Sequence, residues 1–371
     1  MTRMIAAATV ATILVLTVTA AAADEHSWVE RSNENAQIVL DVVAEFNPES
    51  AASLGVDGLD EAIIDYRPRL YERNRSASEA VLGELRERLT TEKEPRVRQD
   101  LEILIQAVED GLRSEQLTRD TLLPYFNVSQ TVFRGVRALV DPQVPRERYP
   151  AAIVRMQKYA GLAGAEKPLT ELAKDRTRER FDVGGLVGPY RGEVLQDLQR
   201  SESIINGIEE LLTGTDLEGW EETYEVLAGQ LAAYNDWVRA EILPRARDDY
   251  RLPGPLYEDA LRNWGVDADP VDLIEQATKG YMDIRNEMEA LAPLVAKEKG
   301  YETSDYREVI ALLKRDGALD GDKLLDHYND VLREIEEIIV REDMVTLPER
   351  DAGIRIATEA ETAVQPAPHL D

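Results

Sequence analysis

The chain has 371 residues, of which 43% are hydrophobic, 72 are acidic and 43 are Lys or Arg, so its formal net charge is −29. This acidic excess argues against a protein that follows nucleic-acid phosphates or adsorbs to an anionic membrane surface, because both need clustered Lys and Arg. The sequence contains no cysteine, which excludes disulfides, thiolate nucleophiles and cysteine-ligated zinc or iron–sulfur sites.

The first 23 residues have the layout of a secretory signal peptide. Arg3 supplies a short basic region, residues 4–19 are apolar and uncharged, and the alanines at 20–23 provide the small residues of a cleavage site. The apolar stretch is too short for a stop-transfer helix, although an uncleaved N-terminal anchor is the alternative. We therefore expect an exported protein, periplasmic or secreted, that leaves the membrane once the signal peptide is removed.

The body of the chain predicts an all-α fold, because its apolar residues recur at spacings of three and four. In chain order, the predicted helices cover residues 27–46, 68–89, 95–117, 149–162, 169–181, 190–212 and 219–242. Prolines delimit several of them, since proline is tolerated in a first turn but breaks a helix interior. Four prolines interrupt the pattern between residues 124 and 150, where no helix is predicted, and the glycine-rich segment 183–189 is predicted to be a loop or a helix break.

The last third of the chain gives the clearest periodicity. Asp269 and Pro270 provide an N-cap and a first-turn proline, and Gly300 provides a stop, so a long helix is predicted between them. Its apolar face comprises Leu273, Ala277, Tyr281, Ile284, Met288, Leu291 and Val295. Shorter helices are predicted at 304–313 and 320–340. The second of these is expected to face inward with Leu324, Tyr328, Val331, Ile335 and Ile338.

Neither an internal repeat nor a low-complexity linker divides this region, so residues 24–343 are assigned to one helical domain. Residues 344–371 depart from the helical pattern. Apolar and charged residues alternate over 354–358, which is typical of a β-strand, yet no other segment predicts a partner strand. No closing helix is predicted after it. Two interpretations stay open: a disordered tail, or the first strand of a sheet that lies downstream of this polypeptide.

No catalytic or metal-binding constellation is visible in the sequence. His26, His327 and His369 are far apart, whereas a zinc-binding helix needs two histidines four residues apart. The acidic clusters are assigned to solvated faces, because a chain with 72 carboxylates produces such clusters by chance. The glycine-rich segment 183–189 matches neither the dinucleotide fingerprint nor the phosphate-binding loop. A nucleophile elbow is also absent.

The most unusual stretch, residues 243–270, mixes arginines and aromatics with kinks at proline and glycine. Such a composition is typical of a recognition surface on a connecting segment. The candidate recognition residues are Arg247, Tyr250, Arg251, Tyr257, Arg262 and Trp264. The alternative is a well-packed connection between helices that is held by Arg–Asp pairs.

The passage LPGPLYEDALRNWGVDADPVDLIEQA, residues 252–277, resembles the bacterial family known as domain of unknown function 885. Two further segments resemble it, namely RYPAAIVRMQKYAGL at 148–162 and MVTLPER at 344–350. The resemblance covers most of residues 28–365. It implies a mostly helical, zincin-like protein related to metallopeptidases such as the carboxypeptidase Taq group. In such proteins a His-Glu-x-x-His helix in the C-terminal part supplies two zinc ligands and a glutamate that polarises water.

This chain contains no His-Glu-x-x-His motif, so the resemblance transfers no catalytic, cofactor-binding or metal residue to it. We therefore expect the helical N-terminal part of a zincin-like protein, which would wall a peptide cleft, and zinc only where a missing C-terminal part is present. By itself the chain is expected not to be hydrolytic. Two alternatives stay open: a self-sufficient helical binding or scaffold protein of the exported compartment, and a peptidase whose catalytic half is encoded separately. The expected partners are a peptide, a C-terminal half or a second copy of the chain, and no nucleic acid.

Overall fold

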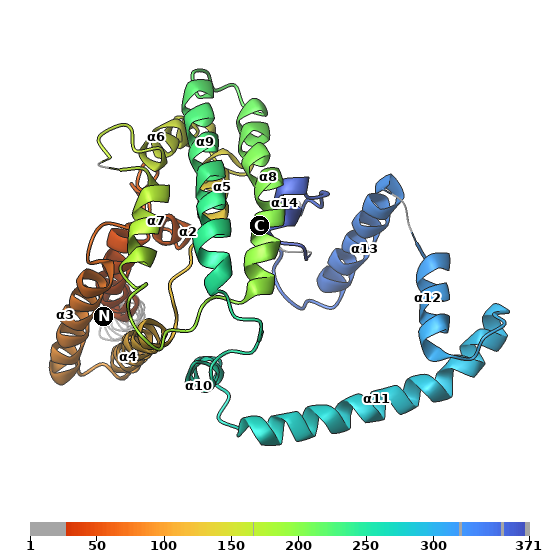
Figure 1. Cartoon of the computed structure of the whole chain (residues 1–371). Helices are drawn as coiled ribbons and strands as arrows, with labels where there is room; N and C mark the ends of the chain where they lie inside the picture. The colour runs from red at the N-terminus through yellow and green to blue at the C-terminus, as the bar shows by residue number, and fades with distance from the viewer. Residues whose placement is uncertain (1–26, 166, 319–320, 350–351, 368–371) are drawn as a thin grey trace, which may run out of the picture. The chain divides into compact units, whose positions relative to one another are not determined.

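The structure is a computed structural model that describes residues 27–165, 167–318, 321–349 and 352–367. The predicted signal peptide, His26 and His369 lie outside these ranges. The chain folds as two compact units (Figure 1). Among the described residues, unit 1 comprises those up to Asn263 and those from Glu359 onward, and unit 2 comprises Trp264–Thr358. The boundary after Asn263 falls inside the region that the sequence analysis assigned to one helical domain.

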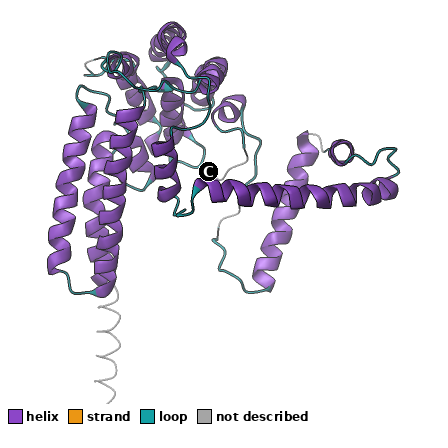
Figure 2. Cartoon of the chain, turned by 60° about the horizontal axis from the view of Figure 1, so that its bottom comes forward, coloured by secondary structure: helices purple, strands orange, loops and turns teal. Residues whose placement is uncertain are grey.

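The prediction of an all-α fold is confirmed, because the described residues form helices and only two isolated β-bridges, with no strand (Figure 2). Unit 1 contains a helix over residues 27–46 and the elements α2 Pro48–Ser53, α3 Leu70–Thr91, α4 Pro95–Thr121, α5 Val128–Val140, α6 Pro150–Tyr159, α7 Leu169–Arg178, α8 Arg191–Thr213, α9 Glu221–Trp237, α10 Gly254–Asn263 and α14 Glu359–Val364. In the part of the chain that is described, no helix combines the length and the apolar character that a membrane span requires.

The main core of unit 1 surrounds α5, a helix that the sequence analysis did not predict. Val128, Val132, Phe133, Val136 and Leu139 are all buried, and α5 packs against α6 and α8. The opposite face of α5 carries Arg134 and Ala138, which are exposed, so α5 is an amphipathic helix whose apolar face the neighbouring helices cover. A smaller core of Leu85, Val97 and Leu101 joins α3, α4 and the helix over residues 27–46, which lie side by side (Figure 2).

The C-terminal segment corrects two expectations. The strand predicted over residues 354–358 is wrong, because this segment is irregular and pairs in no sheet within the described chain. The predicted absence of a closing helix is also wrong, because α14 follows, packs against α8 and is hydrogen-bonded to α5. Ala360 is 1% exposed and lies against Gly207, and Arg137 Nε donates to Glu361 Oε1 at 2.9 Å. The chain therefore leaves unit 1 after α10 and returns to it with α14.

Unit 2 contains α11 Pro270–Lys299, α12 Tyr306–Asp316 and α13 Gly321–Arg341. The predicted bounds of α11 are confirmed: Asp269 Oδ1 accepts from the amide of Val271 at 2.7 Å, and Gly300 adopts the left-handed conformation that ends the helix. Ala292, Ala296 and Val309 form a small core between α11 and α12. Most of the predicted apolar faces of α11 and α13 are exposed, including Tyr281, Ile284, Leu291, Leu324, Tyr328 and Ile335. The expectation that the α13 face points inward is therefore wrong for Leu324, Tyr328 and Ile335.

Candidate recognition surface

The connection from α9 to α10 begins with a change of helix type. The α-helix ends at Trp237, the next turn, Val238–Ile242, is a π-helix, and Leu243–Arg245 forms a single 3-10 turn. Pro244 has no amide hydrogen and cannot continue the helical hydrogen bonds, so the chain leaves the helix here. Single π turns are rare in helices and occur frequently at functional sites.

The following residues are held against the glycine-rich segment 183–189. The amide of Arg247 donates to Pro189 O at 2.9 Å, and the carbonyl of Arg247 accepts from the amide of Arg191 at 2.8 Å. Arg247 Nη1 donates to Gly188 O at 2.7 Å. The glycine-rich segment 183–189 and the connection after α9 are therefore hydrogen-bonded to each other.

Gly188 makes this contact possible. A Cβ atom at this position would lie 1.9 Å from the carbonyl oxygen of Arg245, a separation that no side chain can adopt without moving the backbone. Glycine is required here for the close approach of two backbones. Its role is to join the glycine-rich segment to the connection that follows α9.

Four side chains from this junction form a cation–aromatic stack, which we define as Arg178, Trp237, Phe181 and Arg245. The guanidinium carbon of Arg178 lies 5.5 Å from the centroid of the Trp237 ring, and that of Arg245 lies 4.2 Å from the centroid of Phe181. The two rings stack on each other, with centroids 6.5 Å apart and planes 16° from parallel. Both guanidinium groups are therefore within the distance at which a ring face attracts a cation.

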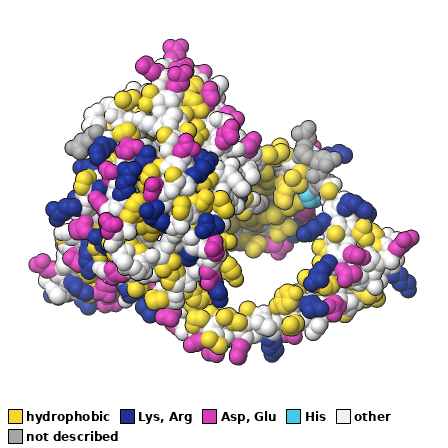
Figure 3. All heavy atoms as spheres, in the orientation of Figure 1, with side chains coloured by type: hydrophobic (Ala, Val, Ile, Leu, Met, Phe, Trp, Pro, Cys, Tyr) yellow, Lys and Arg dark blue, Asp and Glu magenta, His cyan; other side chains and the backbone are white. Residues whose placement is uncertain are grey.

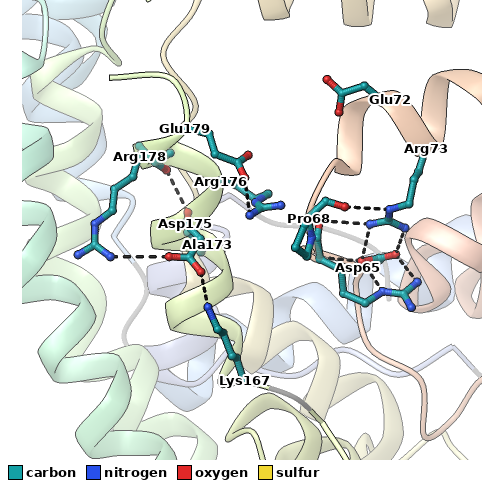
Figure 4. Close-up of polar contacts among 12 residues, drawn as sticks. Asp65, Pro68, Glu72, Arg73, Lys167, Ala173, Asp175, Arg176, Arg178 and Glu179 are labelled. Atoms are coloured by element: carbon teal, nitrogen blue, oxygen red, sulfur yellow. Dashed lines mark hydrogen bonds and ion pairs between the residues drawn. The ribbon is translucent and has the colours of Figure 1, made fainter. Parts of the chain in front are cut away.

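The two arginines of the stack form ion pairs at the surface, and Arg245 Nη1 also donates to the backbone carbonyl of Glu241 at 2.5 Å. Arg245 Nη1 lies 3.0 Å from Glu241 Oε2, and Arg178 Nη1 lies 3.8 Å from Asp175 Oδ1. Their side chains are 42% and 48% exposed. Asp175 also pairs with Lys167, at 2.8 Å, and Arg176 pairs with Glu179 three residues later (Figure 4). Ion pairs this exposed contribute little to stability, so ligand carboxylates can replace them.

Basic side chains gather on this face of unit 1 although the chain as a whole is strongly acidic. In Figure 3, Lys and Arg side chains cluster over the region in which Figure 1 places α7 and α9. Local charges outweigh the distant acidic excess at physiological ionic strength, where the screening length is about 8 Å. A ligand at this surface would therefore interact mainly with these basic side chains and with the carboxylates paired to them.

Three of the candidate recognition residues lie in the connection itself. Arg247 is half-buried and holds backbone carbonyls, as described above. Tyr250 is 73% exposed, and its ring meets that of Tyr190 edge-on at 6.4 Å. Arg251 donates to Asp249 Oδ1 at 3.0 Å, and this bond lowers the pKa of the Asp249 carboxyl. Arg251 therefore fits the alternative of a connection held by Arg–Asp pairs. Tyr250, by contrast, leaves an aromatic face exposed to solvent.

Two more candidates, Tyr257 and Arg262, are exposed on α10. This helix is fixed to α4 by Asp259, which is 5% exposed and accepts from Arg113 Nε at 2.7 Å and Ser114 Oγ at 2.5 Å. The bond from Ser114, and then that from Arg113, lowers the pKa of the Asp259 carboxyl. The sixth candidate, Trp264, is 86% exposed and is the first residue of unit 2, so it belongs to a different unit from the other five.

Sequence reasoning missed Arg178, Phe181 and Trp237. Periodicity indicated that residues 169–181 and 219–242 were helices, but it gave no information on which helix ends meet. In the connection after α9, the mixture of arginine and aromatic side chains did indicate a recognition surface. The same mixture in Arg178, Arg180 and Phe181, at the end of α7, is the signal that could have found the stack.

The one histidine in the described ranges, His327, is exposed on α13 beside the ring of Tyr328. Within the same ranges, no cluster of three or more His, Asp or Glu side chains has the arrangement of a metal site. No geometric basis for placing a metal ion therefore emerges from these residues.

Comparison with known proteins gives one family assignment. Residues 48–371 match the family described as "Bacterial protein of unknown function (DUF885)". A search of curated proteins finds no match. The matched region contains every element from α2 to α14, including the cation–aromatic stack. Since this match covers most of the sequence, and agrees with the resemblance seen at residues 148–162, 252–277 and 344–350, the chain belongs to the DUF885 family.

Proposed function

We propose that this protein is an exported, helical peptide-binding member of its family, and that the surface around the cation–aromatic stack binds an acidic segment of the peptide. The observation that carries the proposal is the pair of exposed guanidinium groups, Arg178 and Arg245, held on aromatic rings in a chain whose net charge is −29. A protein with this charge has no general affinity for anions, so a basic and aromatic surface on it is a specific feature.

The stack supports carboxylate binding through its geometry. A guanidinium group that lies on an aromatic ring still presents N–H groups at its edge, and those not bonded to Glu241 or Asp175 match the oxygens of a carboxylate. The rings fix the position of each guanidinium, which reduces the side-chain entropy lost when a ligand binds. Tyr250 offers an exposed aromatic face for an apolar side chain of the same peptide.

We further propose that these residues do not hydrolyse the bound peptide by themselves. The resemblance to zincin-like metallopeptidases implies a zinc-activated water, yet the three histidines stand at positions 26, 327 and 369 and none forms a His-Glu-x-x-His motif. His327 is exposed on a helix of unit 2. The residues present therefore do not fit a catalytic zinc site, and any hydrolysis would need ligands from another polypeptide segment.

Fluorescence anisotropy with a labelled acidic peptide, such as an oligomer of Glu and Phe, tests the binding proposal at about 0.15 M salt. Replacing Arg178 or Arg245 by Gln removes a charge-assisted hydrogen bond and should weaken binding by roughly three- to tenfold. Arg239→Gln is the matched control, because Arg239 is equally exposed, pairs with Asp236 at 2.8 Å and lies outside the stack. Equal losses in all three variants would show only a general charge effect and would contradict the proposal.

Two measurements test the remaining parts. Intact-mass analysis of the protein from an exporting host should show a mature N-terminus near residue 24, and a retained Met1 would contradict the export proposal. Zinc analysis and a peptidase assay on the same sample should show neither stoichiometric zinc nor cleavage. Stoichiometric zinc together with cleavage would contradict the proposal that these residues are not hydrolytic.

The alternative of a self-sufficient helical binding or scaffold protein, here one that self-associates, is favoured by one observation in unit 2. Tyr281, Ile284 and Leu291 are each more than half exposed on the same apolar face of α11. Exposed apolar patches of this kind are typical of interaction surfaces. Light scattering as a function of concentration separates this alternative from a monomeric peptide-binding protein.

A further inference from the structure

Arg176, in the last turn of α7, is a buried cation that the protein satisfies only in part. The residue is 8% exposed, and Nη2 pairs with Glu179 at 2.6 Å. Nε and Nη1 are also shielded from solvent, but neither has a hydrogen-bond partner among the described residues. Leaving a buried donor unpaired costs about 1–3 kcal/mol, and more for a charged group, so such a residue calls for an explanation.

Arg155 is a buried arginine of the same unit with a structural role, and only its Nε lacks a partner among the described residues. It is 1% exposed, and its Nη1 and Nη2 donate to the carbonyls of Gly135 and Leu59 at 2.7 and 3.0 Å. Those bonds tie two segments of the fold together. The two unpartnered nitrogens of Arg176 reach no backbone carbonyl of the described chain, so bridging chain segments does not account for its burial.

The unpartnered side of Arg176 faces the start of α3. In Figure 4 its guanidinium points away from α7 towards Pro68, two residues before the helix begins. Two contacts link these helix ends through Arg119, in the last turn of α4: Arg180 Nη2 donates to Arg119 O at 2.7 Å, and Arg119 Nη2 lies 2.7 Å from Glu72 Oε1 in the first turn of α3. Arg180 adds another donor, because its Nε is buried without a partner in the described ranges.

The N-terminus of α3 has spare donors of its own. Its N-cap, Arg69, has a φ of 58° and provides no side-chain cap. The amides of residues 70–72 precede the first helical hydrogen bond, which runs from Arg73 N to Arg69 O. Such amides form a ready site for an anion, and the helix dipole adds positive potential.

The nearby acidic groups do not satisfy this cluster. Asp65 is fully used, since it accepts from both Arg67 and Arg73. Glu179 pairs only with Nη2 of Arg176, and Glu72 forms an ion pair with Arg119. Within the described chain, two nitrogens of Arg176 and one of Arg180 thus remain as donors without an acceptor.

We propose that these donors, together with the first-turn amides of α3, bind one small oxyanion, either phosphate or a carboxylate. The anion would lie between the end of α7 and the start of α3, and a slight separation of these two segments would admit it. This site is separate from the cation–aromatic stack, and it does not depend on the peptide-binding function proposed above.

Calorimetry and thermal unfolding of the whole chain in inorganic phosphate, against chloride at equal ionic strength, test the proposal. We expect one saturable phosphate site in the wild type and a melting temperature that rises with phosphate. Arg176→Gln should weaken phosphate binding roughly tenfold or more, because it removes a charge-assisted contact. Arg86→Gln, an exposed arginine of α3 paired with Glu109, is the control and should bind phosphate like the wild type.

If Arg176→Gln does not fold, Arg180→Gln provides the same test and should also weaken phosphate binding. Acetate in place of phosphate, and a peptide with a free against an amidated C-terminus, identify which oxyanion the site prefers. Wild-type protein without saturable binding of either anion would overturn the proposal. Binding that survives in both the Arg176 and Arg180 variants would overturn it as well. Peptide binding at the cation–aromatic stack is measured in a separate experiment. Failure of the oxyanion proposal is therefore distinguishable from failure of the peptide-binding proposal.

Discussion

Gly135 is the position at which the packing of unit 1 can be tested most sharply. It lies in α5, and a Cβ atom there would be 2.0 Å from the hydroxyl oxygen of Tyr159. Tyr159 is fully buried and donates to Glu49 Oε1 at 2.7 Å. Burial, and then the charge of Glu49, raises the pKa of Tyr159 well above its usual value, so the hydroxyl keeps its proton. Gly135→Ala must therefore displace a hydrogen-bonded group that has no room to move.

The expected loss of stability can be worked out from these contacts. Overpacking in a core costs about 1–3 kcal/mol, and losing a hydrogen bond to a charged group costs about 1.5–3 kcal/mol. The higher helix propensity of alanine compared with glycine offsets up to about 1 kcal/mol of this loss. We therefore expect Gly135→Ala to lower the free energy of unfolding by roughly 1.5–5 kcal/mol. Gly229→Ala in α9 is the control, because nothing lies within 4 Å of its new Cβ, and it should stabilise the protein by up to about 1 kcal/mol.

A double-mutant cycle with Tyr159→Phe isolates the clash. Removing the hydroxyl leaves the ring carbon Cζ, at 3.1 Å, as the closest atom to the new Cβ. Gly135→Ala should therefore cost at least about 1 kcal/mol less in the Tyr159→Phe background than in the wild type, a coupling well above additivity error. Urea unfolding, with hydrogen exchange of the α5 amides to report on unit 1 alone, gives the four free energies. Additive losses would refute this account of the packing between α5 and α6.

Three further predictions concern charge and exposed surface. Burial alone would raise the pKa of Asp65, but its two arginine partners hold that pKa well below the usual value, so the stabilisation is present above about pH 4 and is lost as the pH falls further. Asp65→Asn should therefore reduce the acid dependence of the unfolding free energy, and an unchanged dependence would contradict this. Asp259→Ala leaves Arg113 without its buried partner and should expose α10 to proteolysis before the rest of unit 1, which limited digestion followed by mass spectrometry would show. Ile284→Glu should lower any concentration-dependent light scattering without changing helix content, whereas unchanged scattering would exclude this face of α11 as the self-association surface.

Much of the fold could be predicted because apolar periodicity and proline positions are local signals. The start and the end of α11 follow from Asp269, Pro270 and Gly300, and each performs the predicted capping role. By contrast, α5 was missed although one of its faces is apolar and buried while Arg134 and Ala138 on the opposite face are exposed. The prolines that surround it then suggested an irregular region.

The segment at 354–358 shows the opposite failure. Its alternation of apolar and charged residues matches a strand, but a strand exists only where a partner supplies hydrogen bonds. The described chain supplies none, and the segment instead leads into α14, whose Ala360 fits against Gly207. A short helix of this kind depends on tertiary packing rather than on its own propensity, so sequence patterns alone do not indicate it.

The candidate site could be predicted only in part. The sequence drew attention to the connection after α9, and Tyr250 within it is indeed exposed. The stack itself joins the end of α7 to the end of α9 and to the turn that contains Arg245. Contacts between residues so far apart in the chain depend on how the helices pack, which periodicity does not determine.

The most direct test of the proposed function is calorimetric titration of one acidic peptide into the wild type and into the double variant with Arg178→Gln and Arg245→Gln. We expect saturable binding at a ratio of one peptide per chain in the wild type, and at least roughly tenfold weaker binding in the double variant. Equal affinity in the two proteins, or no binding to the wild type, would contradict the claim that the cation–aromatic stack binds an acidic peptide.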